Sequence, residues 1–511
     1  MQEDSPLTTH HSPPDSNRDT THVSRPLLPP PSFFLTFILI AMKNVFLLIG
    51  LLCCTAVVRA QQYYAPKVFG VEELRADIRY CRNFHEAHNT NVYAYHTKAY
   101  VDSVFDALER NVQPMDAMTF YAYLWPIGTT ISDGHCLIFP PQDWINRSEW
   151  IKGYFPYRIR KEGPAFIVTM DLADTSNAFG DGEMPIHSIN GVAVGTIYEQ
   201  VLAALPREGY NVQYPEWIIE KYFYEYYSYV FGHADSFTLQ SYCIEESLDT
   251  TPCATAVVPA ITKDQLVARR IMRYPDYPMT KARETGIQLT RHDSLDAAVL
   301  TIFTWDKLVL LKHYGILFKR EIDRHMQSLI ADSVGTLIID LRNNQGGYMG
   351  YGVHVMRWLM PEKFDYIDAL EKVSMQHSGE RKYKKANTMR FRDKKPFKHN
   401  YSGNVIILTN GGTFSNSSIF TARMQYYGRA IVMGEETGGS ATQLTGSFGY
   451  HRPLIMPNTK IEMSHINYRI VVDASKPYSG QGVIPDLPLS DEWDPERGDV
   501  ILQTILSALK H

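Results

Sequence analysis

The sequence has few cysteines and no excess of basic side chains. Six cysteines among 511 residues are too few for a disulfide scaffold of this size. The 50 lysines and arginines are outnumbered by 55 aspartates and glutamates, so the chain lacks the basic surplus that binding along a nucleic-acid backbone needs. With 44% hydrophobic and 21% charged residues, it is neither a disordered, a fibrous nor a polytopic membrane protein. At roughly 100–200 residues per domain, its length predicts several globular domains.

The first sixty residues have the composition of a leader and not of a folded domain. Residues 1–32 are rich in Ser, Thr, His and Pro, so we interpret residues 1–41 as disordered or as an extension upstream of the true start. Lys43 then precedes an apolar run that ends in small residues before Gln61, which is typical of a secretory signal peptide. We expect residues 42–60 to be that signal and the mature chain to be exported, to the periplasm or the outside of the cell.

The same segment has an alternative interpretation as a membrane anchor. Residues 33–58 are long enough to span a bilayer if Lys43 is tolerated. The part after Lys43 is short for a span, which favours cleavage. We therefore expect membrane association only if the signal stays uncleaved.

Signal cleavage would leave four cysteines in the mature chain. Cys243 and Cys253 lie ten residues apart, so they are the plausible disulfide pair in an oxidising compartment. Four buried free thiols fit the sequence equally well.

Changes in hydrophobic period divide the mature chain into three parts. Residues 61–148 repeat apolar side chains at helical spacing and predict a helical domain. In residues 149–260 the period moves toward two, and a strand, an Asn190-Gly191 turn, a second strand and a helix follow one another. That order resembles the core of a PDZ-type module.

The third part, residues 261–511, alternates strands and helices, which predicts an α/β domain of βαβ units. Its first segment, about 262–292, reads as a polar connector, and the basic stretch 381–398 reads as a solvated surface insertion. The strands are expected at 297–303, 335–340, 405–408 and 430–433, with a helix at 316–331.

Two loops that follow buried strands carry the chemistry. Residues 340–347 read DLRNNQGG, and a Gly-Gly pair lets backbone N–H groups face a ligand. Residues 410–418 read NGGTFSNSS and lead into a helix, so Ser415 stands at a strand-to-helix junction. Its Oγ could be an exposed nucleophile there, or it could simply cap the helix.

These loops belong to a longer ordered signature. Residues 340–347 are followed by Thr413-Phe414-Ser415, then by GEETGG at 434–439 and GVIPD at 482–486. This order resembles that of the tail-specific (C-terminal processing) protease family, and the helical start and the PDZ-like part also fit it. The resemblance implies a crotonase-like catalytic domain and an exported serine endopeptidase that cleaves polypeptides through an acyl-enzyme.

The resemblance also implies roles for individual residues. Ser415 would be the nucleophile and His135 its general base, as in the tricorn-core-like Ser/His branch, because a neutral imidazole can take the serine proton. Backbone N–H groups of Gly346 or Gly347 and of Asn416 would form the oxyanion hole. His135 could instead be a buried turn histidine. We expect no cofactor and no metal.

The chain departs from the family pattern at two positions. The Ser/Lys branch has its lysine 25 residues after the nucleophile, where this chain has Ser440. The Ser/His branch has a glutamate three residues before Gly482, where this chain has Ser479. A catalytically weak or inactive member that only binds peptides is therefore the alternative.

Another side chain would have to orient the imidazole, since Ser479 cannot supply a carboxylate. The candidates for this role are Asp473, Glu435 and Asp133. An esterase of the α/β-hydrolase type is disfavoured because Ser415 lacks the G-x-S-x-G surroundings of a nucleophile elbow.

Overall fold

The computed structural model of the protein describes residues 66–148, 151, 153–173, 184–242, 252–375, 381–447, 453–464, 466–490, 493–494 and 498–510. The predicted leader, residues 1–60, lies outside this part of the chain. Cys243 and the side chain of Cys253 do so too, so the pairing of these two cysteines stays a prediction. Cys81 and Cys136 are buried free thiols. No helix among the described residues combines the length and the apolar character needed to cross a membrane.

The N-terminal part is helical, as its periodicity predicts. Its helices are α2 (Val71–His88), α3 (Lys98–Asn111), α4 (Ala117–Tyr123), α5 (Trp125–Ile131) and α6 (Gln142–Ser148), and its short strands are β1 (Val68–Phe69), β2 (Met115–Asp116) and β3 (Ile138–Phe139). The apolar stripes of α2 and α3 supply buried side chains such as Leu74, Ile78 and Phe105 to one core.

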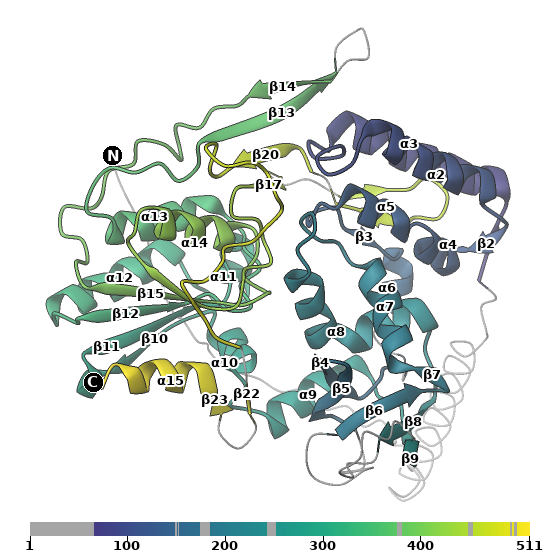
Figure 1. Cartoon of the computed structure of the whole chain (residues 1–511), viewed down its shortest axis with the longest axis horizontal. Coiled ribbons are helices and arrows are strands. Elements are labelled where there is room, and N and C mark those ends of the chain that lie inside the picture. The colour runs from purple at the N-terminus through teal and green to yellow at the C-terminus, as the bar shows by residue number, and fades with distance from the viewer. Residues whose placement is uncertain are drawn as a thin grey trace, which may run out of the picture. The chain divides into compact units, whose positions relative to one another are not determined.

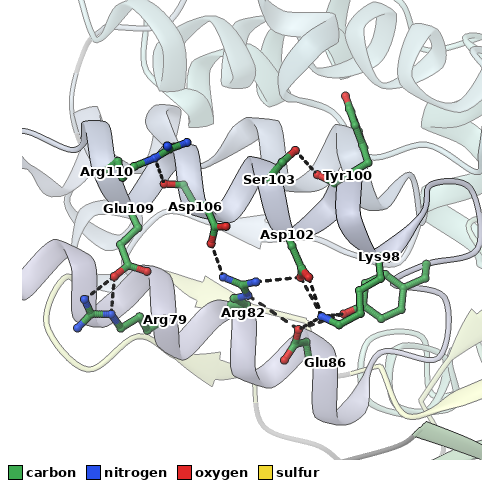
Figure 2. Close-up of polar contacts among 11 residues, drawn as sticks. Arg79, Arg82, Glu86, Lys98, Tyr100, Asp102, Ser103, Asp106, Glu109 and Arg110 are labelled. Atoms are coloured by element: carbon green, nitrogen blue, oxygen red, sulfur yellow. Dashed lines mark hydrogen bonds and ion pairs between the residues drawn. The ribbon is translucent and has the colours of Figure 1, made fainter.

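A row of charges also connects α2 and α3 (Figure 2). Arg82 pairs with Asp106 at 2.7 Å and with Asp102 at 2.9 Å, and Lys98 pairs with Glu86 at 2.9 Å. These pairs lie on the solvent side of the helices, where each contributes at most about 1 kcal/mol. The apolar core between the helices therefore carries more of the stability than the charges do.

A C-terminal segment completes the helical part. Strand β19 (Glu462–Met463) pairs with β3 and with β18 (Leu454–Ile455) in a three-stranded sheet. Met456, Ile461 and Met463 are fully buried in the same core as the helices. The helical core thus combines residues that are more than three hundred positions apart.

The middle part is an antiparallel sheet with two helices. Its strands are β4 (Tyr157–Glu162), β5 (Ala165–Asp171), β6 (Met184–Ile189), β7 (Val192–Ala193), β8 (Ser236–Tyr242) and β9 (Pro252–Pro259), and its helices are α7 (Val194–Ala204) and α8 (Gln213–Phe231). The sheet order is β4-β5-β6-β8-β9, with β7 paired to β6 across the expected Asn190-Gly191 turn. Helix α8 was not predicted from the sequence.

The C-terminal part is an α/β domain with a six-stranded sheet. The strand order is β10-β11-β12-β15-β16-β21, parallel except for β10. The strands are β10 (Ile287–His292), β11 (Ala297–Ile302), β12 (Thr336–Asp340), β15 (Asn404–Thr409), β16 (Ile431–Gly434) and β21 (Leu487–Pro488). Four of these match the predicted strands to within two residues at either end.

Both faces of this sheet are covered, which explains the continuous apolar runs of its strands. Leu337 and Ile339 of β12 pack into the core that α12 (Phe318–Ala331), α13 (Met349–Leu359) and α14 (Asn416–Tyr426) form. Ile338 points the other way and packs with α15 (Val500–Ala508). Figure 1 shows α15 on the side of the sheet opposite to α13 and α14.

The remaining elements connect these parts. The segment expected to be a polar connector contains α9 (Lys263–Arg273) and α10 (Pro278–Thr285). A second sheet has the order β14-β13-β20-β17. Its strands are β13 (Ala369–Met375), β14 (Arg381–Lys385), β17 (Gln443–Gly446) and β20 (Tyr468–Val471), and the chain also has η1 (Asp293–Leu295), α11 (Lys307–Lys312), β22 (Trp493–Asp494) and β23 (Gly498–Asp499).

Candidate active site

Ser415 lies where β15 and its loop meet α14. Its backbone has φ 54° and ψ −120°, a conformation that non-glycine residues rarely adopt. Phe414 N–H donates to the Asn344 carbonyl at 3.1 Å, so the neighbouring Gly-Gly loop holds the turn in place. The Ser415 side chain makes no capping hydrogen bond to the helix, so its hydroxyl is not used as a helix cap.

His135 lies in the loop after α5. Asp133 shapes this loop, because its Oδ1 accepts the His135 backbone N–H at 2.9 Å and the Thr445 hydroxyl at 2.7 Å. The imidazole Nε2 then lies 3.0 Å from Ser415 Oγ. The two candidates, 280 positions apart in the sequence, therefore meet within hydrogen-bond distance.

The imidazole is largely shielded from water. Its ring packs against Phe414 with 4.7 Å between ring centroids, and its side chain is 21% exposed. Burial lowers the pKa of His135 below its usual value, and the negative charge of Asp133 partly opposes this. The ring is therefore neutral near pH 7, as a general base must be.

A glutamate that the sequence analysis did not select faces the other ring nitrogen. Glu208 Oε1 lies 3.7 Å from His135 Nδ1. Glu208 follows α7 in a Pro-Arg-Glu-Gly segment that carries no motif, so no local signal could have identified it. It is fully buried, as is Asp133.

Burial acts on both carboxyls beside His135. It raises the pKa of Glu208 to about 7, against a hydrogen bond from Tyr478 that lowers it. Burial, followed by repulsion from Glu208, raises the pKa of Asp133 to about 7. One ligand atom from each of Asp133, His135 and Glu208 lies within 4.8 Å of the others, so this group has the donors that a small cation could use.

The backbone around the serine offers two hydrogen-bond donors. Gly346 N–H is already bonded to Asn344 Oδ1 at 3.0 Å. The N–H groups of Gly347 and Asn416 have no hydrogen-bond partner among the described residues. Of the three predicted oxyanion-hole residues, Gly347 and Asn416 therefore have a free donor, whereas the Gly346 N–H is occupied.

The Asn416 side chain is fixed by its neighbours. Its Oδ1 accepts the Tyr366 hydroxyl at 2.6 Å, and its Nδ2 donates to the Tyr348 carbonyl at 3.3 Å. Asn416 and Tyr366 are both fully buried. These bonds hold the first turn of α14, and with it the Asn416 N–H, in one orientation.

Two of the candidates for orienting His135 have other partners. Asp473 accepts the hydroxyl and the backbone N–H of Ser475 at 2.6 and 3.0 Å. Glu435 lines a cavity of about 530 Å³ beside Trp217 and Glu216. Asp133 is the candidate that the structure brings to His135, although its Oδ1 is bonded to the backbone and not to the ring.

The two positions that depart from the family pattern are occupied by structural serines. Ser440 is fully buried, and its Oγ accepts backbone N–H groups of Thr442 and Gln443 at 3.3 and 3.4 Å. Ser479 is exposed and accepts the Gln481 N–H at 3.3 Å.

Comparisons with known proteins agree with this architecture. Residues 296–488 match the model of Peptidase family S41. Mature CPAF in complex with lactacystin aligns with a TM-score of 0.60 at 13% identity, over 86% of this chain and 98% of that one. Mature CPAF alone gives 0.58 at 12% identity, over 86% and 97%. A photosystem II D1 C-terminal processing protease aligns over 86% and 97% at 14% identity, with a TM-score of 0.42.

The fold and the family match together define a serine-type peptidase with a mixed α/β, multidomain architecture. Residues 296–488 are similar to peptidase family S41, and a protease of this kind acts on polypeptides.

Proposed function

We propose that the protein is a serine endopeptidase in which Ser415 is the nucleophile and His135 is the general base. The observation that carries this proposal is the 3.0 Å distance between His135 Nε2 and Ser415 Oγ. A serine hydroxyl is a weak nucleophile until a base accepts its proton. The neutral imidazole and the strained serine backbone suit that role.

The steps follow from this geometry. Ser415 Oγ attacks the scissile carbonyl while its proton moves to His135 Nε2, which forms an imidazolium. The carbonyl oxygen becomes an oxyanion, and the N–H groups of Gly347 and Asn416 donate to it. Each such donor lowers the barrier by roughly 3 kcal/mol. The imidazolium then protonates the leaving amine, and water releases the acyl group by the same route in reverse.

We assign the chain to the Ser/His branch and not to the Ser/Lys branch. Support comes from Ser440, which stands at the position where the Ser/Lys branch has its lysine. The Ser440 Oγ accepts backbone N–H groups of its own turn. We also propose that the β4–β9 sheet with α7 and α8 is a PDZ-like module and that the catalytic domain is crotonase-like. Export through a cleaved signal at residues 42–60 completes the proposal, and N-terminal sequencing of the secreted protein tests it.

Labelling by a fluorophosphonate, which modifies activated serines, tests the mechanism without knowledge of the substrate. We expect Ser415→Ala to abolish labelling and His135→Ala to slow it by at least about 100-fold. Ser479→Ala is the matched control, because it removes an exposed serine hydroxyl and should leave labelling unchanged. Equal labelling of the Ser415→Ala protein would overturn the proposal.

The second candidate is a peptide-binding member with little or no turnover. The observation that favours it is that His135 Nδ1 is buried with no hydrogen-bond partner among the described residues. Its signature is peptide binding that Ser415→Ala leaves unchanged, with no cleavage at any pH.

A further inference from the structure

Nδ1 of His135 points away from Ser415 and lacks a bonded partner. Nε2 lies 3.0 Å from Ser415 Oγ, whereas Nδ1 is buried without a hydrogen bond to any described residue. To accept the serine proton at Nε2, the imidazole must carry its own proton on Nδ1. The reaction therefore needs an acceptor at Nδ1 that selects this tautomer.

The nearest acceptor is the Glu208 carboxylate. Its Oε1 lies 3.7 Å from Nδ1 and is itself buried without a partner among the described residues. A buried donor and a buried acceptor that face each other are the two halves of one hydrogen bond. The backbone N–H of Gly134 also interacts with the Glu208 carboxylate and lowers its pKa. Catalytic hydrogen bonds are often long in the unliganded state and shorten when substrate binds.

We propose that Glu208 is the positioning residue of the active site, accepting the Nδ1–H of His135 and stabilising the imidazolium that forms when Ser415 attacks. Glu208 forms no covalent bond in the reaction, and the proton stays on His135 Nδ1. The role rests on the Ser415–His135 mechanism proposed above.

The carboxylate is held in place on its other side. Tyr478 donates its hydroxyl to Glu208 Oε2 at 3.0 Å, and Asn91 Nδ2 donates to the Tyr478 oxygen at 3.0 Å. Gly209 N–H donates to the Ser132 carbonyl at 2.8 Å. The backbone next to Glu208 is thus bonded directly to the loop that carries His135, which fixes the separation of the two side chains.

Because the carboxylate beside His135 comes from Glu208, the chain does not need a glutamate at position 479, where it has a serine. Tyr478 and Gly480, on either side of it, both approach Glu208: Tyr478 by its hydroxyl, and Gly480 so closely that a Cβ there would lie 2.7 Å from the Glu208 carbonyl oxygen. The segment that contains Ser479 therefore holds a carboxylate that comes from the α7–α8 loop and supplies none itself.

Asp133 is the competing carboxyl, because its Oδ2 is also buried without a partner among the described residues. Its Oδ1 is used by the backbone N–H of His135 and by Thr445. Of the described carboxyls, Glu208 is the one that makes a close contact with a ring nitrogen of His135. Asp133 shapes the loop, whereas Glu208 faces the imidazole.

The groups around Glu208 define how its charge depends on pH. Asp133, His135, Tyr95 and Tyr478 face it, and burial raises its pKa to about 7 while the Tyr478 hydrogen bond lowers it. The ionised form needed beside the imidazolium is therefore gained as the pH rises through about 7. Removing the Tyr478 hydroxyl should move this acid limb to higher pH.

The test measures the rate of fluorophosphonate labelling of the full chain against pH. Glu208→Gln keeps the shape of the side chain and removes its charge, so we expect at least about 100-fold slower labelling. Tyr478→Phe should keep the plateau rate within about threefold and shift the acid limb upward, which loss of stability alone would not do. Glu362→Gln makes the same chemical change at an exposed glutamate in the loop after α13 and should match the wild type.

The outcomes separate this inference from the proposed function. Wild-type labelling and pH dependence in Glu208→Gln, with labelling lost in Ser415→Ala, would overturn the role of Glu208 alone. Loss of rate in Asp133→Asn but not in Glu208→Gln would transfer the role to Asp133. If Glu208→Gln does not fold, an unshifted acid limb in Tyr478→Phe counts against the proposal. If Ser415→Ala labels like the wild type, the mechanism itself is wrong.

Discussion

Gly346 packs directly on Ser415. A Cβ built on Gly346 would come within 2.7 Å of Ser415 Cβ and 2.8 Å of the Asn416 nitrogen, and Gly346 itself has φ +96°. The glycine thus allows the 340–347 loop to lie against the nucleophile turn. It also leaves open the space beside one of the two free N–H donors.

Gly346→Ala should therefore damage the active site more than the fold. The added methyl must displace the Ser415 turn, so we expect labelling by a fluorophosphonate to fall by at least about 100-fold. Gly163→Ala is the matched control, because Gly163 also has positive φ but has no atom within 4 Å of its Cβ position. That variant should lose about 1 kcal/mol of stability and no activity. Equal labelling of the two variants would contradict this interpretation.

Ser417 is a second serine close to the proposed nucleophile, and its hydroxyl has a structural role. Its Oγ accepts the Trp305 indole N–H at 2.7 Å, and both residues are fully buried. Ser417→Ala leaves that N–H without a partner, so we expect a loss of about 1–3 kcal/mol in the free energy of unfolding. Labelling at a temperature where the variant is folded should stay within about threefold of the wild type. Abolished labelling in a folded Ser417→Ala protein would place Ser417 in the chemistry.

Sequence periodicity predicted four of the six strands of the α/β sheet, β11, β12, β15 and β16, because they read as continuous apolar runs. Helix α8 was missed for the opposite reason. It buries residues around much of its circumference, among them Trp217, Ile219 and Phe223, so its aromatic-rich sequence shows no single helical stripe. The basic stretch 381–398 was interpreted as solvated, yet Arg381 makes three bonds to backbone carbonyls.

The same limit applies to the site. Ser415 and His135 could be selected because each lies in a recognisable motif, and the fold brings them together. Glu208 could not be selected from the sequence, since its distinguishing features are its burial and its short distance from His135. Both arise from packing between segments far apart in the chain, which no local pattern encodes.

The buried carboxyls beside His135 should make stability depend on pH in a definite direction. The folded-state pKa of Glu208 is about 7, above its ordinary value of 4.5, so the folded protein binds more protons than the unfolded chain between these values. Its contribution to the free energy of unfolding is therefore lost as the pH rises from about 4.5 to 7. Glu208→Gln removes this contribution, so its stability relative to the wild type should increase over that range. Urea unfolding at several pH values measures the difference in free energy of unfolding between Glu208→Gln and the wild type. A difference that does not change with pH would contradict the raised pKa of Glu208.

Arg381 connects the β13–β14 hairpin to the helical part. Its guanidinium donates to the carbonyls of Asn89 at 2.6 Å, His85 at 3.4 Å and Glu86, at the C-terminal end of α2. The His85 carbonyl also accepts the Asn89 N–H at 3.1 Å. Because the last carbonyls of a helix lack partners in the next turn, such a cation bonds them and complements the helix dipole.

Arg381→Ala should free the end of α2. We expect a loss of about 1–3 kcal/mol in stability and faster amide hydrogen exchange in the last turn of α2. Lys384→Ala, an exposed change on the same strand, is the control and should leave exchange in α2 unchanged. Since His135 comes from the helical part and Ser415 from the α/β domain, the Arg381 variant should also label more slowly, by up to about tenfold. Unchanged exchange at the end of α2 in the Arg381 variant would show that the hairpin does not hold this helix.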